Sequence, residues 1–435
     1  MSRFLRGPKA AVKGLNGSFA LISMALAMCI LAACASGPPV SAVTVSPSVI
    51  SPNGDGKDDL ARISYTVNTD AHVTLYLTDA AGKRYDVRSG DRPTSPKPYE
   101  YLFNGIGSDG HMLPNGVYTW HVEAQTASGA TMSQQGPLTI QDADTVFPKI
   151  IEFTASANEF TPNRDGIDDH VYINVVTSKA SRLHVYVIGA NGFRYDVPPR
   201  QDSRRSAIDD QFEPGRYFFD YDGGIDLGAD PPPDGQYQLV AESTDKIGQQ
   251  DRLTKTLTIK DSGRPVAEIV TQPNGQGFEW SGVGETPEVT LKLGGTLYFT
   301  TTIRNTGNTP IRTAGPFDPT LCYTMHTSRY SIGPGYPEEP GVWRVGVNFE
   351  TNTGEDHPWR WGVGTLAELT VVERDGFKLY YLPVGKQVQV RGCIVLDRIP
   401  PRNPFRIWGA LIQEQVEIAQ VNSNVSPILV TLVKP

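Results

Sequence analysis

Two nearly identical acidic turns hold the side chains of this sequence that could bind an ion. The segments 51–59 (SPNGDGKDD) and 161–169 (TPNRDGIDD) each place one Asn and three Asp within seven residues. Carboxylate and amide oxygens suit a hard cation such as Ca²⁺, which takes about six to eight oxygen ligands. The candidate ligands are Asn53, Asp55, Asp58, Asp59, Asn163, Asp165, Asp168 and Asp169.

The same turns also fit a purely structural role. Neither is followed by the bidentate Glu of an EF-hand loop, so an ion would need further oxygens from elsewhere. Asn and Asp side chains equally accept backbone N–H bonds in turns. Two possibilities therefore stay open: a weak calcium site that stiffens the module, or an Asx-rich turn without an ion. A similar turn at 273–277 (PNGQG) lacks carboxylates, and we expect no ion there.

The acidic turns open an internal repeat, which organises the middle of the chain. At an offset of 110 residues, 14 of the 37 positions from 51 to 87 are identical. Further along the offset grows to 119, so the second copy carries a net insertion of nine residues between 198 and 234. Apolar and polar residues alternate in segments such as 73–78, which indicates half-buried strands. We predict an all-β chain of tandem Ig-like β-sandwiches followed by a larger β-sandwich domain.

The repeat resembles a known module. SPNGDG at 51–56, FNG at 103–105 and PNGVY at 114–118 resemble the Ig-like module of flagellar hook-capping proteins and secreted subtilases. The resemblance covers about 43–142 and, more loosely, 145–262. It implies the Ig-like fold and nothing about flagellar assembly, because one fold serves many functions.

The remaining third of the chain has a different composition. Residues from 263 onward hold five of the six Trp. The segment 297–307 (LYFTTTIRNTG) resembles the strand–turn opening of CARDB-type Ig-like adhesion modules, which implies another sandwich. The run 355–362 (EDHPWRWG) predicts a loop, and loops often carry recognition. Trp359, Arg360 and Trp361 are therefore a candidate ligand surface, since aromatic rings stack on sugars; the alternative is that the rings fill the core.

The N-terminal segment predicts export and lipidation. Residues 1–14 carry four basic residues and no acid, and 19–33 is apolar apart from one Ser. A helix of this length spans about 22 Å, short of the ~30 Å hydrocarbon core of a bilayer. We therefore interpret 1–33 as a signal peptide rather than an anchor helix. The sequence LAAC at 31–34 resembles the lipobox of bacterial lipoproteins, which implies that Cys34 carries lipid and anchors the protein to a membrane.

Two cysteines remain beyond this segment, Cys322 and Cys393. Exported proteins often pair their cysteines, so we expect a disulfide; two separate buried thiols are the alternative. The predicted order of parts is a signal peptide at 1–33, a tether at 34–42, Ig-like domains at 43–144 and 145–262, and a C-terminal sandwich at 263–435.

Composition and motifs exclude several functions. The net charge of −8, from 39 Lys+Arg and 47 Asp+Glu, argues against nucleic-acid binding. The sequence has no Gly-x-Ser-x-Gly elbow, His-Glu-x-x-His motif or Walker loop, so we expect no enzyme and no cofactor beyond possible Ca²⁺. We predict a lipid-anchored cell-surface scaffold, structural or adhesive, whose C-terminal domain meets an unknown protein or glycan. The alternative is a cell-wall or polysaccharide binding module that uses the Trp-rich domain.

Overall fold

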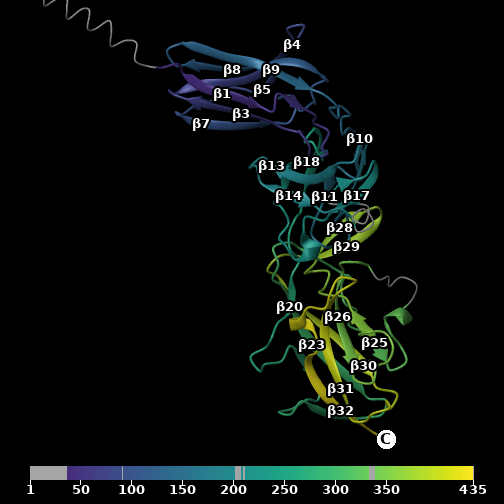
Figure 1. The fold of residues 1–435 in the computed structure, drawn as a ribbon. Coiled ribbons are helices and arrows are strands. Elements are labelled where there is room, and N and C mark those ends of the chain that lie inside the picture. Colours follow the sequence, from purple (N-terminus) through teal and green to yellow (C-terminus); the bar gives the residue numbers. More distant parts are fainter. Residues whose placement is uncertain (1–36, 91, 201–206, 209–210, 333–338, 435) are drawn as a thin grey trace, which may run out of the picture.

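The computed structural model describes residues 37–90, 92–200, 207–208, 211–332 and 339–434. In these ranges the regular structure consists of β-strands and short 3-10 helices, as the sequence predicts. The 3-10 helices are η2 Ile225–Leu227, η3 Arg329–Ile332 and η4 Gln420–Asn422. None of the helices in the described part of the chain is long and apolar enough to span a membrane. Three sandwiches follow one another, and the first described residues and the C-terminus lie at opposite ends of the molecule (Figure 1).

The first sandwich encloses a hydrophobic core of its own. Its strands are β1 Val40–Ser46, β2 Val49–Ile50, β3 Ala61–Val67, β4 Ala71–Asp79, β5 Arg84–Arg88, β6 Pro93–Thr94, β7 Lys97–Phe103, β8 Gly116–Thr126 and β9 Thr131–Ile140. One sheet has the order β1-β3-β7, and the other has the order β2-β9-β8-β4-β5 with β6 added to β4. Val40 is fully buried, so the last three residues assigned to the tether, 40–42, belong to this sandwich.

The second sandwich repeats the two main sheets of the first and adds a short strand pair of its own. Its strands are β10 Ile150–Ala155, β11 Glu159–Phe160, β12 Val171–Thr177, β13 Arg182–Gly189, β14 Arg194–Val197, β15 Ala207–Ile208, β16 Gln211–Phe212, β17 Gly215–Tyr221, β18 Gly235–Thr244 and β19 Gln250–Ile259. The sheets have the orders β10-β12-β17 and β11-β19-β18-β13-β14, which match those of the first copy. The β15–β16 hairpin and η2 lie within 198–234, where the insertion was predicted.

The C-terminal sandwich is larger and holds the third core. Its strands are β20 Ala267–Ile269, β21 Phe278–Trp280, β22 Glu288–Lys292, β23 Thr296–Asn305, β24 Ile311–Thr313, β25 Cys322–Thr324, β26 Trp343–Phe349, β27 Trp359–Trp361, β28 Thr370–Arg374, β29 Phe377–Leu382, β30 Gln387–Val395, β31 Phe405–Gln413 and β32 Val425–Val433. One sheet runs β20-β23-β30-β25 with β21 on β23; the other runs β22-β32-β31-β26-β24-β29-β28 with β27 on β26. The β28–β29 hairpin lies beside the second sandwich (Figure 1).

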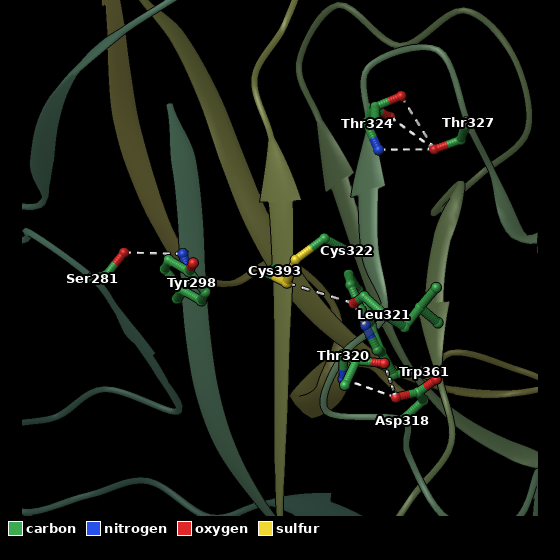
Figure 2. Close-up of a disulfide and its surroundings, with 10 residues drawn as sticks. All are labelled: Ser281, Tyr298, Asp318, Thr320, Leu321, Cys322, Thr324, Thr327, Trp361 and Cys393. Atoms are coloured by element: carbon green, nitrogen blue, oxygen red, sulfur yellow. Dashed lines mark hydrogen bonds between the residues drawn. A yellow bond between two sulfur atoms is a disulfide. The ribbon is translucent and has the colours of Figure 1, made fainter. Parts of the chain in front are cut away.

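Cys322 and Cys393 face each other in the parallel pairing of β25 with β30 and form the expected disulfide (Figure 2). The bond fastens the edge strand β25 to the sheet. The carbonyl of Leu321, next to the disulfide, accepts a hydrogen bond from the indole of Trp361 at 3.3 Å.

Candidate functional site at the interdomain joints

The first acidic turn is held by its own backbone. The carboxylate of Asp59 accepts N–H bonds from Asn53 at 3.0 Å and from Gly54 and Gly56 at 2.8 Å. The Asn53 side chain in turn accepts the N–H of Asp55 at 2.9 Å. These bonds are those of an Asx-rich turn, one of the two structures that the sequence allowed.

The second acidic turn repeats these bonds. Asp169 accepts N–H bonds from Asn163 at 3.1 Å and from Gly166 at 2.7 Å, and Asp165 accepts the N–H of Ile167 at 2.9 Å. Within the described ranges, no group of three or more Asp, Glu, His or Cys is arranged to hold a metal ion. Calcium binding stays a prediction from sequence, and the turns are explained by hydrogen bonds alone.

Arg164 replaces a glycine of the first copy without changing the turn. It has φ 54, in the left-handed region, where Gly54 has φ 75. Its guanidinium pairs with Asp226 of η2 at 3.1 Å. The insertion of the second copy therefore packs on this turn.

The turn at 161–169 lies in the joint between the second and third sandwiches. Arg312 of β24 donates to the carbonyl of Asp165 at 3.0 Å, and Gln413 of β31 donates to the carbonyl of Arg164 at 2.9 Å. Two strands of the third sandwich thus bind the backbone of the turn directly. The third sandwich needs only the shape of this loop for these contacts, not its side chains.

The β28–β29 hairpin adds side-chain contacts to the same joint. The hydroxyl of Tyr381 donates to the carboxylate of Asp165 at 2.8 Å. Arg374 forms an ion pair with Asp168. Three of the predicted cation ligands therefore contribute to the joint: Asp165 and Asp168 through these contacts and Asp169 by shaping the turn.

The pKa values of the equivalent residues Asp59 and Asp169 shift in opposite directions, because the two turns differ in burial. Burial raises the pKa of Asp169, the nearby charge of Asp165 raises it further, and the result is about 6. Asp59 is less buried; burial raises its pKa, but N–H bonds from Gly54, Gly56 and Asn53 outweigh that effect and lower the pKa overall. The same motif thus favours the ionised carboxylate at Asp59 in the first sandwich and disfavours it at Asp169 in the second.

The turn at 245–249 makes the other joint, between the first and second sandwiches. The Asn104 amide donates to the carbonyl of Ile247 at 2.8 Å, and the Met112 N–H donates to the side chain of Gln249 at 3.1 Å. Both donors belong to the first sandwich and both acceptors to the second. The first acidic turn also reaches this joint, because Gly54 lies against Ile247.

The linker between these sandwiches is fastened as well. The Lys179 ammonium contacts the carboxylates of Asp144 at 2.7 Å and Asp245 at 2.5 Å, and donates to the carbonyl of Val146 at 2.7 Å. Gln249 donates to the carbonyls of Asp144 and Val146, both at 3.0 Å. The side chain of Asp245 is fully buried, and Lys179 places the opposite charge directly beside it.

The prediction that Trp359, Arg360 and Trp361 form a ligand surface is wrong. Trp359 is 1% exposed, Arg360 6% and Trp361 0%. The predicted loop contains the strand β27, whose pairing with β26 turns both Trp side chains into the core. Trp361 packs edge-on against Phe299, with ring centroids 4.8 Å apart. The alternative, that the two Trp rings fill the core, is therefore correct.

Arg360 points the opposite way and belongs to a buried ionic cluster that the sequence did not reveal. Its guanidinium pairs with Glu414, which is itself buried. Arg329 at 3.2 Å and Arg344 at 3.4 Å also contact this carboxylate. The four residues come from separate parts of the chain, so no local motif marks them.

The predicted lipidation site, Cys34, and the signal peptide 1–33 lie outside the described residues.

Comparison with known proteins identifies no family, because no family model and no curated protein matches the chain. A solved tetra-tandem repeat from the extending region of a large adhesion protein is 13% identical, covering 85% of this chain and 80% of that one, with a TM-score of 0.19. A Ca²⁺-stabilized adhesin that helps an Antarctic bacterium reach out and bind ice is 12% identical, covering 91% and 74%, with a TM-score of 0.19. E. coli alpha-2-macroglobulin is 9% identical, covering 92% and 24%, with a TM-score of 0.20. Such low scores carry no argument, so the resemblances to hook-capping and CARDB-type modules stay predictions.

Proposed function

We propose that this protein is a non-enzymatic scaffold of the cell envelope, lipid-anchored through Cys34, whose two Ig-like sandwiches form a stiff arm carrying the C-terminal sandwich. The observation that supports this most directly is that side-chain hydrogen bonds cross both joints and that each joint contains a fully buried one. Domain pairs move relative to one another unless their interface restrains them. A chain that restrains both joints keeps a fixed distance between its two ends.

The repeated turn supports the same proposal. In the second copy it is the surface on which the third sandwich docks, and in the first copy it lies against the second sandwich. A motif that shapes the joint accounts for its appearance in both copies without an ion or a substrate. The polysaccharide alternative has lost the exposed Trp residues that motivated it, and we do not propose it.

Two measurements test this function. Small-angle X-ray scattering of the full chain in detergent should fit one extended shape; a broad range of shapes would overturn the stiff arm. Mass spectrometry of the protein from its host should find diacylglycerol on Cys34, and Cys34→Ala should release the protein from membranes. Membrane retention of Cys34→Ala, or an unmodified Cys34, would overturn the anchor.

A further inference from the structure

A cleft of about 340 Å³ lies beside the joint between the second and third sandwiches. Its volume falls within the range of ligand pockets, which often lie between domains. The turn at 161–169 forms one wall and the β28–β29 hairpin the other. The hairpin residues on it are Thr370, Val372, Arg374, Leu379 and Tyr381. These are alternate residues of each strand, so the cleft occupies one face of the hairpin.

The cleft combines apolar walls with negative charge. Ile167, Val372 and Leu379 supply apolar surface. Asp165 and Asp261 supply carboxylates. In the described part of the chain, no Lys, Arg or His forms an ion pair with either carboxylate.

The two guanidinium groups near Asp165 are already engaged elsewhere. Arg374 pairs with Asp168, and Arg312 pairs with Glu339. Among the described residues, the carboxylates of the cleft therefore lack a positively charged partner. A long basic side chain matches it, because such a chain packs its methylene stem on apolar surface and holds its charge at the end.

The strand next to the cleft is an unprotected sheet edge. β28 ends its sheet and, within the described ranges, pairs only with β29. All five of its residues are exposed; the neighbouring Val371 and Val372, on opposite faces, are 41% and 44% exposed. An exposed edge with apolar residues and no proline is a template for another strand. An extended segment added there would turn alternate side chains toward the cleft.

We propose that β28 and this cleft form a docking site for an extended segment of a partner protein, which adds as a strand to β28 and inserts a lysine or arginine side chain between Val372 and Ile167. The stem of that side chain packs on Val372 and Leu379, and its charge meets Asp165 and Asp261. This site rests on the proposed scaffold function, because both sandwiches must be docked for the cleft to exist.

A synthetic peptide tests the site directly. The probe is the acetylated and amidated peptide TVTKTVT carrying a fluorophore, titrated with the full chain in detergent while anisotropy is measured. The matched control replaces its lysine by glutamate. Two further versions carry N-methyl groups on alternate amides, in one phase or the other, and so remove one set of edge hydrogen bonds each. The lysine peptide should bind at least about tenfold more tightly than the glutamate peptide, and one N-methyl phase should abolish binding.

A protein variant completes the test. Asp261 is exposed, so Asp261→Asn should fold normally and weaken the lysine peptide about fivefold, while the glutamate peptide gains or stays unchanged. Absence of binding, equal binding of the two peptides, or indifference to both N-methyl phases would overturn the proposal. Dimerisation of the full chain through β28, detected by sedimentation and lost in Val372→Lys, would assign the edge to a second copy and also overturn it. Scattering from the unbound chain tests the stiff arm separately, so failure of the scaffold and failure of the site are distinguishable.

Discussion

Replacing one glycine in each acidic turn by alanine separates the role of the turn from the role of the joint. Gly56 and Gly166 are equivalent and have φ 87 and φ 83, so either alanine pays the same left-handed backbone strain of about 1–2 kcal/mol. A Cβ on Gly56 meets nothing within 4 Å. A Cβ on Gly166 would lie 2.1 Å from the carbonyl oxygen of Pro340, across the joint. Gly166→Ala must therefore push the two sandwiches apart, whereas Gly56→Ala leaves its joint intact.

The cost of opening the second joint follows from the contacts that are lost. The hydrogen bonds from Arg312, Gln413 and Tyr381 to the turn contribute about 0.5–1.5 kcal/mol each, so together they stabilise the joint by about 1.5–4.5 kcal/mol. We expect Gly166→Ala to raise amide exchange at 161–169 and 339–341 and to enlarge the range of shapes in X-ray scattering. Gly56→Ala should change neither. Equal exchange and equal scattering in the two variants would refute the argument that the turn holds this joint.

Four further predictions follow from the same structure. Because the pKa of Asp169 is raised to about 6, the folded state binds a proton more tightly than the unfolded chain, and this contributes ~3 kcal/mol of stability that is complete below about pH 4 and is lost as the pH rises through 6. The stability of the second sandwich, measured by amide hydrogen exchange, should therefore fall between pH 4 and 7, and Asp169→Asn should flatten that fall. An unchanged slope in the variant would contradict the burial of this carboxylate. Replacing both Cys322 and Cys393 by alanine should cost the third sandwich about 4 kcal/mol in urea unfolding, because the disulfide closes a loop with a sequence separation of 71; a loss under ~1 kcal/mol would mean that strand pairing suffices. Lys179→Met should leave the carboxylates of Asp144 and Asp245 without their cation and destabilise the first joint by about 3 kcal/mol. Amide hydrogen exchange at 245–249 should become faster in this variant, whereas Lys179→Arg should retain most of the protection from exchange. Removing divalent ions with EDTA should leave the melting temperature unchanged, because Asp59 and Asp169 already accept loop N–H bonds; a fall that Ca²⁺ reverses would establish the calcium site predicted from the sequence.

Local pattern was enough to predict the fold class and the repeat. Alternation in 73–78 predicts the half-buried strand β4, and Val73, Leu75 and Leu77 are indeed buried. The offsets of 110 and 119 residues reproduce the correspondence of β3 with β12 and of β8 with β18. These features depend on side chains a few residues apart, and the sequence displays such spacing directly.

The roles of the acidic turns and of the Trp pair were decided by tertiary structure. Asp59 and Asp169 stand at equivalent positions of one motif, yet their pKa values shift in opposite directions because Asp169 is much more deeply buried and lies near the charge of Asp165. Trp359 and Trp361 share a face by alternation, but their pairing with β26 determines that this face is the core. The partners of the joints, such as Arg312 and Gln413, lie more than a hundred residues from the turn they bind. Burial and contacts between distant segments produce no local sequence pattern, because they depend on how whole sandwiches pack.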